Sequence, residues 1–121
     1  MLSERQRLSL QDIVDYIDRI FSHLAQLTAQ DFTTFERNEL VSDAVERCMG
    51  RISEAAGRLG EEADDIAPGP PWADIRGLGN QLRHEYHNIQ LAIIWEIIND
   101  DLQPLGEACR KAIADDEEGG V

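Results

Sequence analysis

The sequence has few cysteines and no long apolar run. Only two of its 121 residues are cysteine, Cys48 and Cys109. Both lie in apolar helical patterns without a second Cys or His at zinc-ligand spacing, so we expect two reduced core thiols. The longest apolar stretch, "LAIIWEII", is broken by Glu96 and falls short of the about 20 residues of a membrane span. The first residues lack the apolar segment of a signal peptide. We therefore expect one cytoplasmic domain over residues 1–121.

Positive charge is also scarce. Eleven Lys and Arg residues face 24 Asp and Glu, for a net charge of −13. This balance disfavours non-specific binding to nucleic acid, and we expect neither DNA nor a membrane as a partner. The segments "GEEADDIA" and "ADDEEGGV" carry many of the carboxylates and are interpreted as a solvated loop and a tail that frays from about residue 115. A local basic patch stays open, because several arginines lie mid-chain: Arg47, Arg51, Arg58, Arg76 and Arg83.

Strand patterns are absent as well, since no stretch alternates apolar and polar residues for long enough. Apolar residues instead recur every three or four positions over residues 8–27 and 37–59, which predicts two amphipathic helices. Between them, "LTAQDFTTF" is typical of a turn or a short helical step. Gly50 and Gly57 in the second helix suggest close packing against a neighbour.

The second half of the chain predicts two further helices. The segment "GEEADDIAPGPPW" reads as a linker, because its prolines forbid a regular helix. A third helix is expected from near Trp72, with Pro71 at its first turn, and a fourth from near Gln90. Pro104 either kinks the fourth helix or starts a last segment. The predicted fold is all-α, an up-and-down bundle of four main helices.

Polar side chains gather in "GLGNQLRHEYHNI", residues 77–89. Arg76, Asn80 and His84 are four positions apart and share one face of a helix, and Arg83 lies near that face. His84 and Tyr86 point nearly opposite ways on a continuous helix, so they converge only if the helix ends close by. Such an end is a place where a polar cluster meets solvent or a second chain.

A purely structural interpretation of this segment stays open. A histidine near a helix C-terminus is favoured by the macrodipole alone. Tyr86 could cover the end of the bundle, and Arg76 and Arg83 could pair with Asp74 or Glu85. A metal site on His84 and His87, which are three apart, is disfavoured because no helical Glu-x-x-His pair accompanies them, and we expect no metal or cofactor.

The chain resembles the HepT-like toxins of the HEPN superfamily, which are small prokaryotic helical bundles. The resemblance covers nearly the whole chain. It includes "VSDAVERCMGRISEAAGRL", the segment "IRGLGNQLRHEYHNI" after "PW", and "NDDLQPL". The family pattern I-x-G-(M)-R-N-x-L-x-H-x-Y and the Trp-bearing helix after it match in register at Ile75, Gly77, Asn80, Leu82, His84, Tyr86, Ile89 and Trp95.

This resemblance implies a homodimeric, metal-independent endoribonuclease whose site forms where two protomers meet. His84 would be the catalytic histidine, Asn80 its polar companion, and Tyr86 the acceptor of AMP. The AMP would come from a nucleotidyltransferase antitoxin, the partner in a type VII-like toxin–antitoxin pair, and RNA would be the substrate.

One position departs from the pattern, because Gly79 stands where the family has its catalytic arginine. RNA cleavage needs a cation for the charge that develops on phosphate, and losing such a donor typically costs about 100- to 1000-fold in rate. Arg76 and Arg83 are the nearest substitutes, with Arg47 and Arg51 on the second helix as others. Three hypotheses follow: a weakened or inactive ribonuclease toxin, a non-catalytic module that docks the nucleotidyltransferase, or a helical dimer whose polar segment is only an interface.

Overall fold

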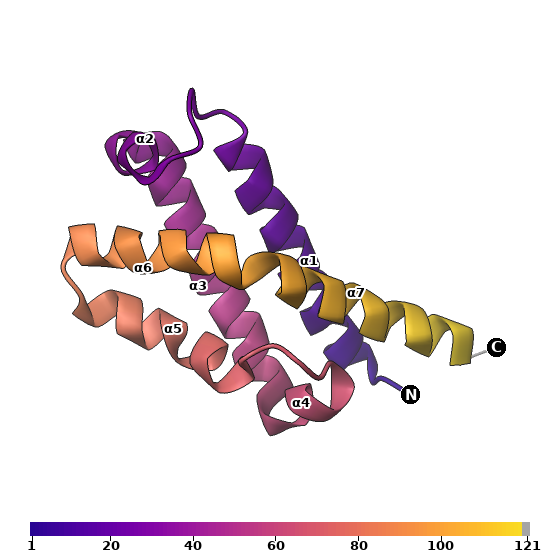
Figure 1. Cartoon of the computed structure of the whole chain (residues 1–121). Coiled ribbons are helices and arrows are strands. Elements are labelled where there is room, and N and C mark those ends of the chain that lie inside the picture. The colour runs from indigo at the N-terminus through magenta and orange to yellow at the C-terminus, as the bar shows by residue number, and fades with distance from the viewer. Residues whose placement is uncertain (120–121) are drawn as a thin grey trace.

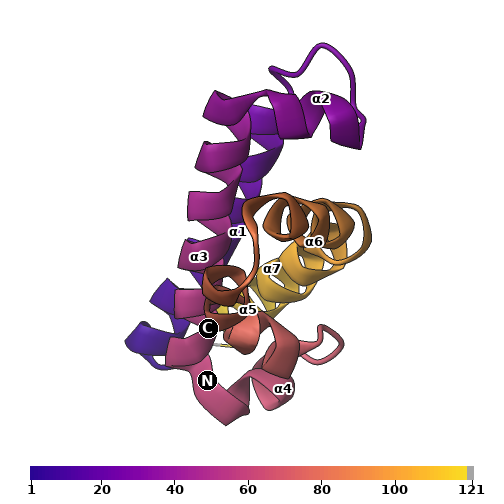
Figure 2. The same cartoon turned by 90° about the vertical axis from the view of Figure 1, so that its left-hand side faces the viewer.

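A computed structural model describes residues 1–119, and the regular structure of this part of the chain consists of helices, without strands. The predicted all-α helical bundle is confirmed. The long helices α1 (Glu4–Leu24) and α3 (Glu39–Leu59) pack side by side as an antiparallel pair (Figure 1). Helices α5 (Trp72–His84), α6 (His87–Asp100) and α7 (Leu102–Gly119) lie together on one side of that pair (Figure 2).

Helix α1 begins earlier than its apolar stripe. Ser3 and Gln6 form a capping box, in which the Ser3 hydroxyl accepts a hydrogen bond from Gln6 N–H and the Gln6 side chain accepts one from Ser3 N–H. The expected start near residue 8 was therefore late, and the helix also ends earlier than expected, at Leu24. Most of its apolar stripe is buried as the spacing predicted, with Phe21 exposed as the exception: Leu10, Ile13, Val14, Ile17, Ile20 and Leu24.

The segment between α1 and α3 contains the short helix α2 (Phe32–Arg37). Asp31 caps it, because its carboxylate accepts a hydrogen bond from Thr34 N–H at 2.8 Å, and this bond lowers the pKa of Asp31. Phe35 is fully buried, and its ring centroid lies 5.1 Å from that of Trp95 on α6. The expected short helical step is thus confirmed, and it joins α3 to α6.

The acidic linker is more ordered than predicted. It forms a 3-10 turn, η1 (Gly60–Glu62), and a short helix, α4 (Ala63–Ile66), before the prolines end regular structure. Ala63 and Ala67 are buried, which fixes this segment on the core. The turn at Gly60 has a φ of +65°, a conformation that glycine adopts without steric cost.

The predicted fourth helix is two helices. Helices α6 and α7 follow one line across the α1–α3 pair and meet at Asp101, with Pro104 in the first turn of α7, where proline is tolerated (Figure 1). Helix α7 packs on α1, so the first and last helices share the core. Within residues 1–119, no helix is both long and apolar enough to span a membrane.

The acidic end of α7 differs from the expected frayed tail. The helix continues to Gly119, and the Asp116 carboxylate accepts a hydrogen bond from Leu2 N–H at 2.7 Å and pairs with Arg7. These bonds hold residues 115–119 against the start of α1. The remainder of the expected tail, residues 120–121, lies outside the described residues.

Candidate functional site

The polar segment is positioned by a firm anchor at the start of α5. Trp72 is buried, and its indole Nε1 donates a hydrogen bond to the Ala67 carbonyl at 2.8 Å. Ile75, Leu78 and Leu82 then place one stripe of α5 in the core against α3. This packing leaves the polar residues between them on the two flanks of α5.

Ser53 joins α3 to α5 at the position of Gly79. The Ser53 hydroxyl donates a hydrogen bond to the Arg76 carbonyl and accepts one from Gly79 N–H, both at 3.1 Å. A Cβ atom on Gly79 would lie 3.3 Å from Ser53 Oγ, closer than most Cβ contacts. Glycine therefore fits a tight helix crossing here, and a larger residue requires Ser53 to move.

Sequence reasoning missed Ser53. It lies four residues after the buried Met49, so its helical spacing places it on the core face of α3. A polar residue at that register was the available signal. The glycines that the sequence singled out behave differently, because Cβ atoms on Gly50 and Gly57 would meet nothing within 4 Å. The expectation of close packing at Gly50 and Gly57 was wrong, and the close approach occurs at Gly79.

The Arg76 side chain is held in place by a hydrogen bond to a backbone carbonyl. Its Nη1 donates a hydrogen bond at 2.8 Å to the carbonyl of Gly60, the residue that caps the C-terminus of α3. A cation at this end of a helix is also favoured by the macrodipole. The contact differs from the ion pair with Asp74 that the sequence left open, and it gives Arg76 a structural role.

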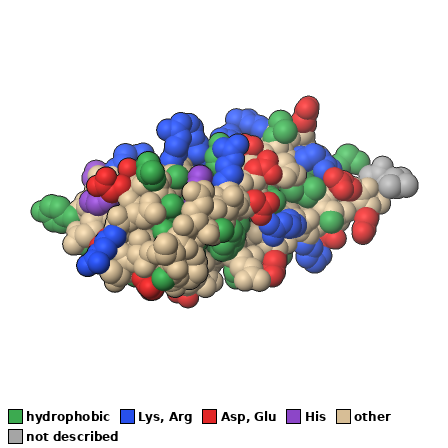
Figure 3. All heavy atoms as spheres, turned by 90° about the horizontal axis from the view of Figure 1, so that it is seen from above, with side chains coloured by type: hydrophobic (Ala, Val, Ile, Leu, Met, Phe, Trp, Pro, Cys, Tyr) green, Lys and Arg blue, Asp and Glu red, His purple; other side chains and the backbone are tan. Residues whose placement is uncertain are grey.

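A surface groove of about 510 Å³ runs between α3 and α5. We call it the α3–α5 groove, and it is lined by Glu46, Gly50, Ser53, Glu54, Gly57, Arg76, Gly79, Asn80, Leu82, Arg83 and Gln90. Four of the sequence-predicted positions, Arg76, Gly79, Asn80 and Arg83, thus meet in one groove. Its charge is mixed, since Glu46 and Glu54 face it as well, and Glu54 pairs with Arg51 at 3.3 Å. Mixed charge also marks the face seen in Figure 3, where basic and acidic side chains alternate.

His84 and Tyr86 lie outside the lining of that groove. His84 is exposed and is the last residue of α5, and Tyr86 is 81% exposed. The helix ends close to these residues, as the sequence suggested, since Glu85 and Tyr86 are extended and α6 starts at His87. The Gln90 side chain donates to the Leu82 carbonyl and so supports this end of α5. One chain therefore brings two arginines and Asn80 together but leaves the imidazole apart from them.

The arrangement offers exposed acid–base and cationic groups rather than a metal centre. Among residues 1–119, no group of three or more His, Cys, Asp and Glu side chains is placed to hold a metal ion. Cys48 and Cys109 are buried free thiols, as expected, and burial raises the pKa of Cys109 to about 12. A thiol with such a pKa stays protonated at neutral pH and does not act as a nucleophile.

The described residues thus form an all-helical bundle with Asn80, His84 and Tyr86 on or beside the hairpin of α5 and α6. The family model "Ribonuclease HepT-like" matches residues 13–112, and the chain belongs to this family. The family match supports a ribonuclease type of function for this fold.

Relatives come from archaea and bacteria. "Putative RNase MJ0125" of Methanocaldococcus jannaschii is 27% identical over 109 residues, covering 90% of this chain and 91% of its own. "Putative RNase MJ1216" of the same organism is 25% identical over 89% of this chain and 87% of its own. "Putative RNase TTE0752" of Caldanaerobacter subterraneus is 28% identical over 68% of this chain and 73% of its own. No solved structure matches the chain significantly.

Proposed function

We propose that the chain is the HepT-like component of a type VII-like toxin–antitoxin pair, with its own RNA cleavage weakened by Gly79. The observation that carries this proposal is the α3–α5 groove. The segment that resembles the catalytic motif lines it, and at Gly79 the groove wall presents backbone and no side chain. Membership of the ribonuclease family supports RNA as the substrate class.

The reaction would be a metal-independent transesterification. The 2′-oxygen of a ribose attacks the adjacent phosphorus, the 5′-oxygen leaves, and a 2′,3′-cyclic phosphate and a 5′-hydroxyl remain. His84 is the proposed base, because its exposed imidazole can take the proton of the attacking 2′-hydroxyl and return one to the leaving 5′-oxygen. Arg83 is the better substitute cation, since it is exposed in the groove while the Arg76 guanidinium is bonded to Gly60.

A homodimer is part of the proposal. His84 lies outside the α3–α5 groove of its own chain, so a complete site needs this imidazole to approach a groove from elsewhere. Two-fold symmetry supplies that geometry, because each protomer then offers its His84 to the groove of the other.

Metal-free RNA cleavage with a chelator present tests the ribonuclease. Because a side chain at residue 79 presses on Ser53, both compared variants carry Ser53→Ala: Gly79→Arg/Ser53→Ala and the matched control Gly79→Ala/Ser53→Ala. We expect the arginine variant to cleave about 100- to 1000-fold faster than the alanine variant. His84→Ala added to the arginine variant should abolish cleavage. Equal rates of the two variants would overturn the role given to residue 79, and cleavage that survives His84→Ala would overturn the role of His84.

The second candidate function is a non-catalytic module that docks a nucleotidyltransferase and accepts AMP. The 81% exposure of Tyr86 favours it, because the phenol is open to a second active site. In that transfer the phenolic oxygen attacks the α-phosphorus of ATP, pyrophosphate leaves, and the phenolic proton passes to a base.

Intact-mass measurement after incubation with ATP and a nucleotidyltransferase encoded beside this gene tests the transfer. We expect one added AMP, lost in Tyr86→Phe and retained in Tyr16→Phe. Tyr16 is a suitable control because it is half-buried on α1, where Arg19 lies 5.0 Å from its ring centroid. An AMP that remains on Tyr86→Phe would exclude Tyr86 as the acceptor.

A further inference from the structure

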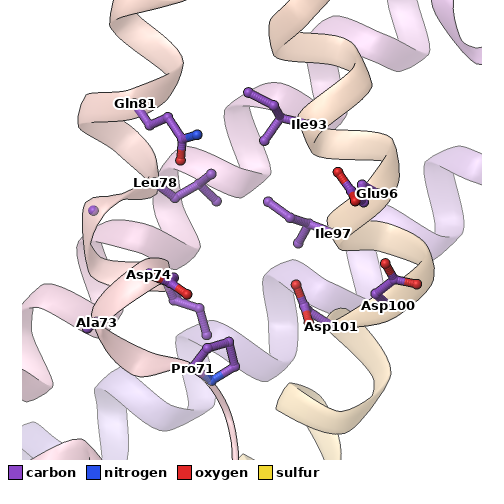
Figure 4. Close-up of a pocket in the computed structure, with 12 residues that line it drawn as sticks. Pro71, Ala73, Asp74, Leu78, Gln81, Ile93, Glu96, Ile97, Asp100 and Asp101 are labelled. Atoms are coloured by element: carbon purple, nitrogen blue, oxygen red, sulfur yellow. The ribbon is translucent and has the colours of Figure 1, made fainter.

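Helices α5 and α6 form a hairpin, joined near its turn by the hydrogen bond from Gln90 to the Leu82 carbonyl. Only residues 85 and 86 connect them, yet the packing of each is mainly on other helices, α5 on α3 and α6 on α7. Between the arms lies a cleft of about 520 Å³, which we call the α5–α6 cleft (Figure 4). Its lining comes from residues 71–81 and 93–101.

The floor of the α5–α6 cleft is apolar. Leu78 on α5 and Ile93 and Ile97 on α6 point toward one another across it (Figure 4). Ile93 and Ile97 are half-buried, so part of their apolar surface stays in contact with solvent. Covering that surface with another apolar side chain is favourable.

The rim of the same cleft is acidic. Asp74 of α5 faces Glu96, Asp100 and Asp101 of the other arm, and no Lys, Arg or His is among the described residues that line it. None of these four carboxylates takes part in an ion pair within residues 1–119. Burial, together with the charges of Asp100 and Asp74, raises the pKa of Asp101. The negative charges of Asp100 and Asp74 thus disfavour the ionised form of Asp101 in the isolated chain.

The two flanks of α5 carry opposite chemistry. Asp74, Leu78 and Gln81 line the α5–α6 cleft, whereas Arg76, Asn80 and Arg83 line the α3–α5 groove. Both sets follow the three-and-four spacing of single helix faces. A phosphate backbone is repelled by the first flank, so the cleft is a separate surface from the proposed RNA site.

We infer that the α5–α6 cleft is a docking groove for a basic amphipathic helix of a protein partner. Its apolar floor matches leucine-type anchors spaced three and four residues apart, which is how grooves between helices bind a helix. Its carboxylates match Lys or Arg residues beside those anchors, and this complementarity selects for a cationic partner. The inference does not depend on RNA cleavage and stands if the ribonuclease proposal fails.

The test uses a fluorescent 18-residue peptide with leucine at positions i, i+3, i+4 and i+7 and lysine elsewhere. Fluorescence anisotropy measures its Kd for the full chain at about 0.15 M salt. The double variant Asp74→Asn/Asp100→Asn should weaken binding at least about tenfold, because two charges leave the rim while side-chain shape is kept. The matched variant Asp64→Asn/Asp65→Asn loses the same charge at two exposed positions of α4 and should change Kd less than about twofold.

Two further measurements keep the inference open to refutation on the unmodified protein. Amide chemical shifts should change along residues 73–81 and 93–101, and changes spread over α4 and α7 instead would overturn the inference. A peptide of the same composition in scrambled order should bind at least about tenfold more weakly, since its leucines no longer form one stripe.

Other occupants of the cleft would be revealed by the same experiments. Spermidine that competes as strongly as the peptide would show a site for small polycations and would refute a helix groove. Self-association of the protein that Asp74→Asn/Asp100→Asn alters, measured by sedimentation, would assign the cleft to a second copy of this chain and would equally refute the inference. If both double variants weaken peptide binding equally, the peptide is attracted by the net charge of the protein alone, and the inference is refuted.

Discussion

At the scale of single residues, the contact between Ser53 and Gly79 explains why glycine suits the position where the family pattern has arginine. The sequence alone identified Gly79 as a departure from the pattern, but it could not supply the reason. The reason is a hydroxyl on another helix, 26 positions earlier in the chain, that occupies the space a Cβ would need. Local spacing places Ser53 on the core face of α3, but it does not identify Gly79 as the residue opposite.

Alanine substitutions in α5 test this steric account. Gly77→Ala should stabilise the protein by about 0.5–1 kcal/mol, because alanine is the better helix former and a Cβ there meets nothing within 4 Å. Gly79→Ala should gain less or lose stability, since its Cβ lies 3.3 Å from Ser53 Oγ. Urea unfolding of both variants measures the difference. In a Ser53→Ala background, Gly79→Ala should stabilise the protein about as much as Gly77→Ala does, and equal effects at both glycines in the presence of Ser53 would refute the account.

At the scale of elements, apolar periodicity predicted the bodies of α1, α3 and α5 but not their ends. The ends are set by single side chains, such as Ser3 with Gln6 at α1 and Asn38 at α3. The first of these was readable as a Ser-x-x-Gln capping box. An end of α5 close to Asn88 was also expected, but not the group that supports it, because Gln90 belongs to the next helix.

Removing the Gln90 side chain should loosen the hairpin of α5 and α6. Gln90→Ala leaves the Leu82 carbonyl without this donor, and we expect a loss of about 1 kcal/mol in the free energy of unfolding. Amide exchange near residues 82–86 should also become faster. Gln81→Ala is the matched control, because Gln81 is exposed on α5, and its stability should stay within about 0.5 kcal/mol of the unmodified protein. Similar losses of stability for both variants would argue against a stabilising role of the hydrogen bond from Gln90 to the Leu82 carbonyl.

At the scale of the whole molecule, the bundle was predictable from composition and periodicity, while the site was predictable only in part. The motif residues were found, and three of them share the α3–α5 groove with Gly79. The separation of His84 from that groove was not foreseen, because it depends on where α5 ends. The contact between the start of α1 and the end of α7 was also not predicted, because the sequence of an acidic tail does not indicate which residues it binds.

Low pH should weaken this contact between α1 and α7. The hydrogen bond from Leu2 N–H, with the nearby Arg7, lowers the pKa of Asp116 below its ordinary value of 3.8. Its stabilisation is therefore present above about pH 3.8 and is lost as pH falls through the lower folded value. Asp116→Asn should lower Tm at pH 6 and reduce the further fall of Tm on acidification. Glu118→Gln, an exposed neighbour on α7, should leave both unchanged; a Glu118→Gln variant that behaves like Asp116→Asn would show a general charge effect.

The packing of α7 on α1 has a consequence for biosynthesis. The ribosome synthesises α1 long before α7. The face of α1 that α7 covers is therefore exposed to solvent while the middle of the chain is synthesised. The α1–α3 pair can form early, but the core that α1 shares with α7 closes only after α7, which contains Asp116, has emerged from the ribosome. Newly made chains of this protein therefore pass through a stage with uncovered apolar surface on α1 before the native bundle exists.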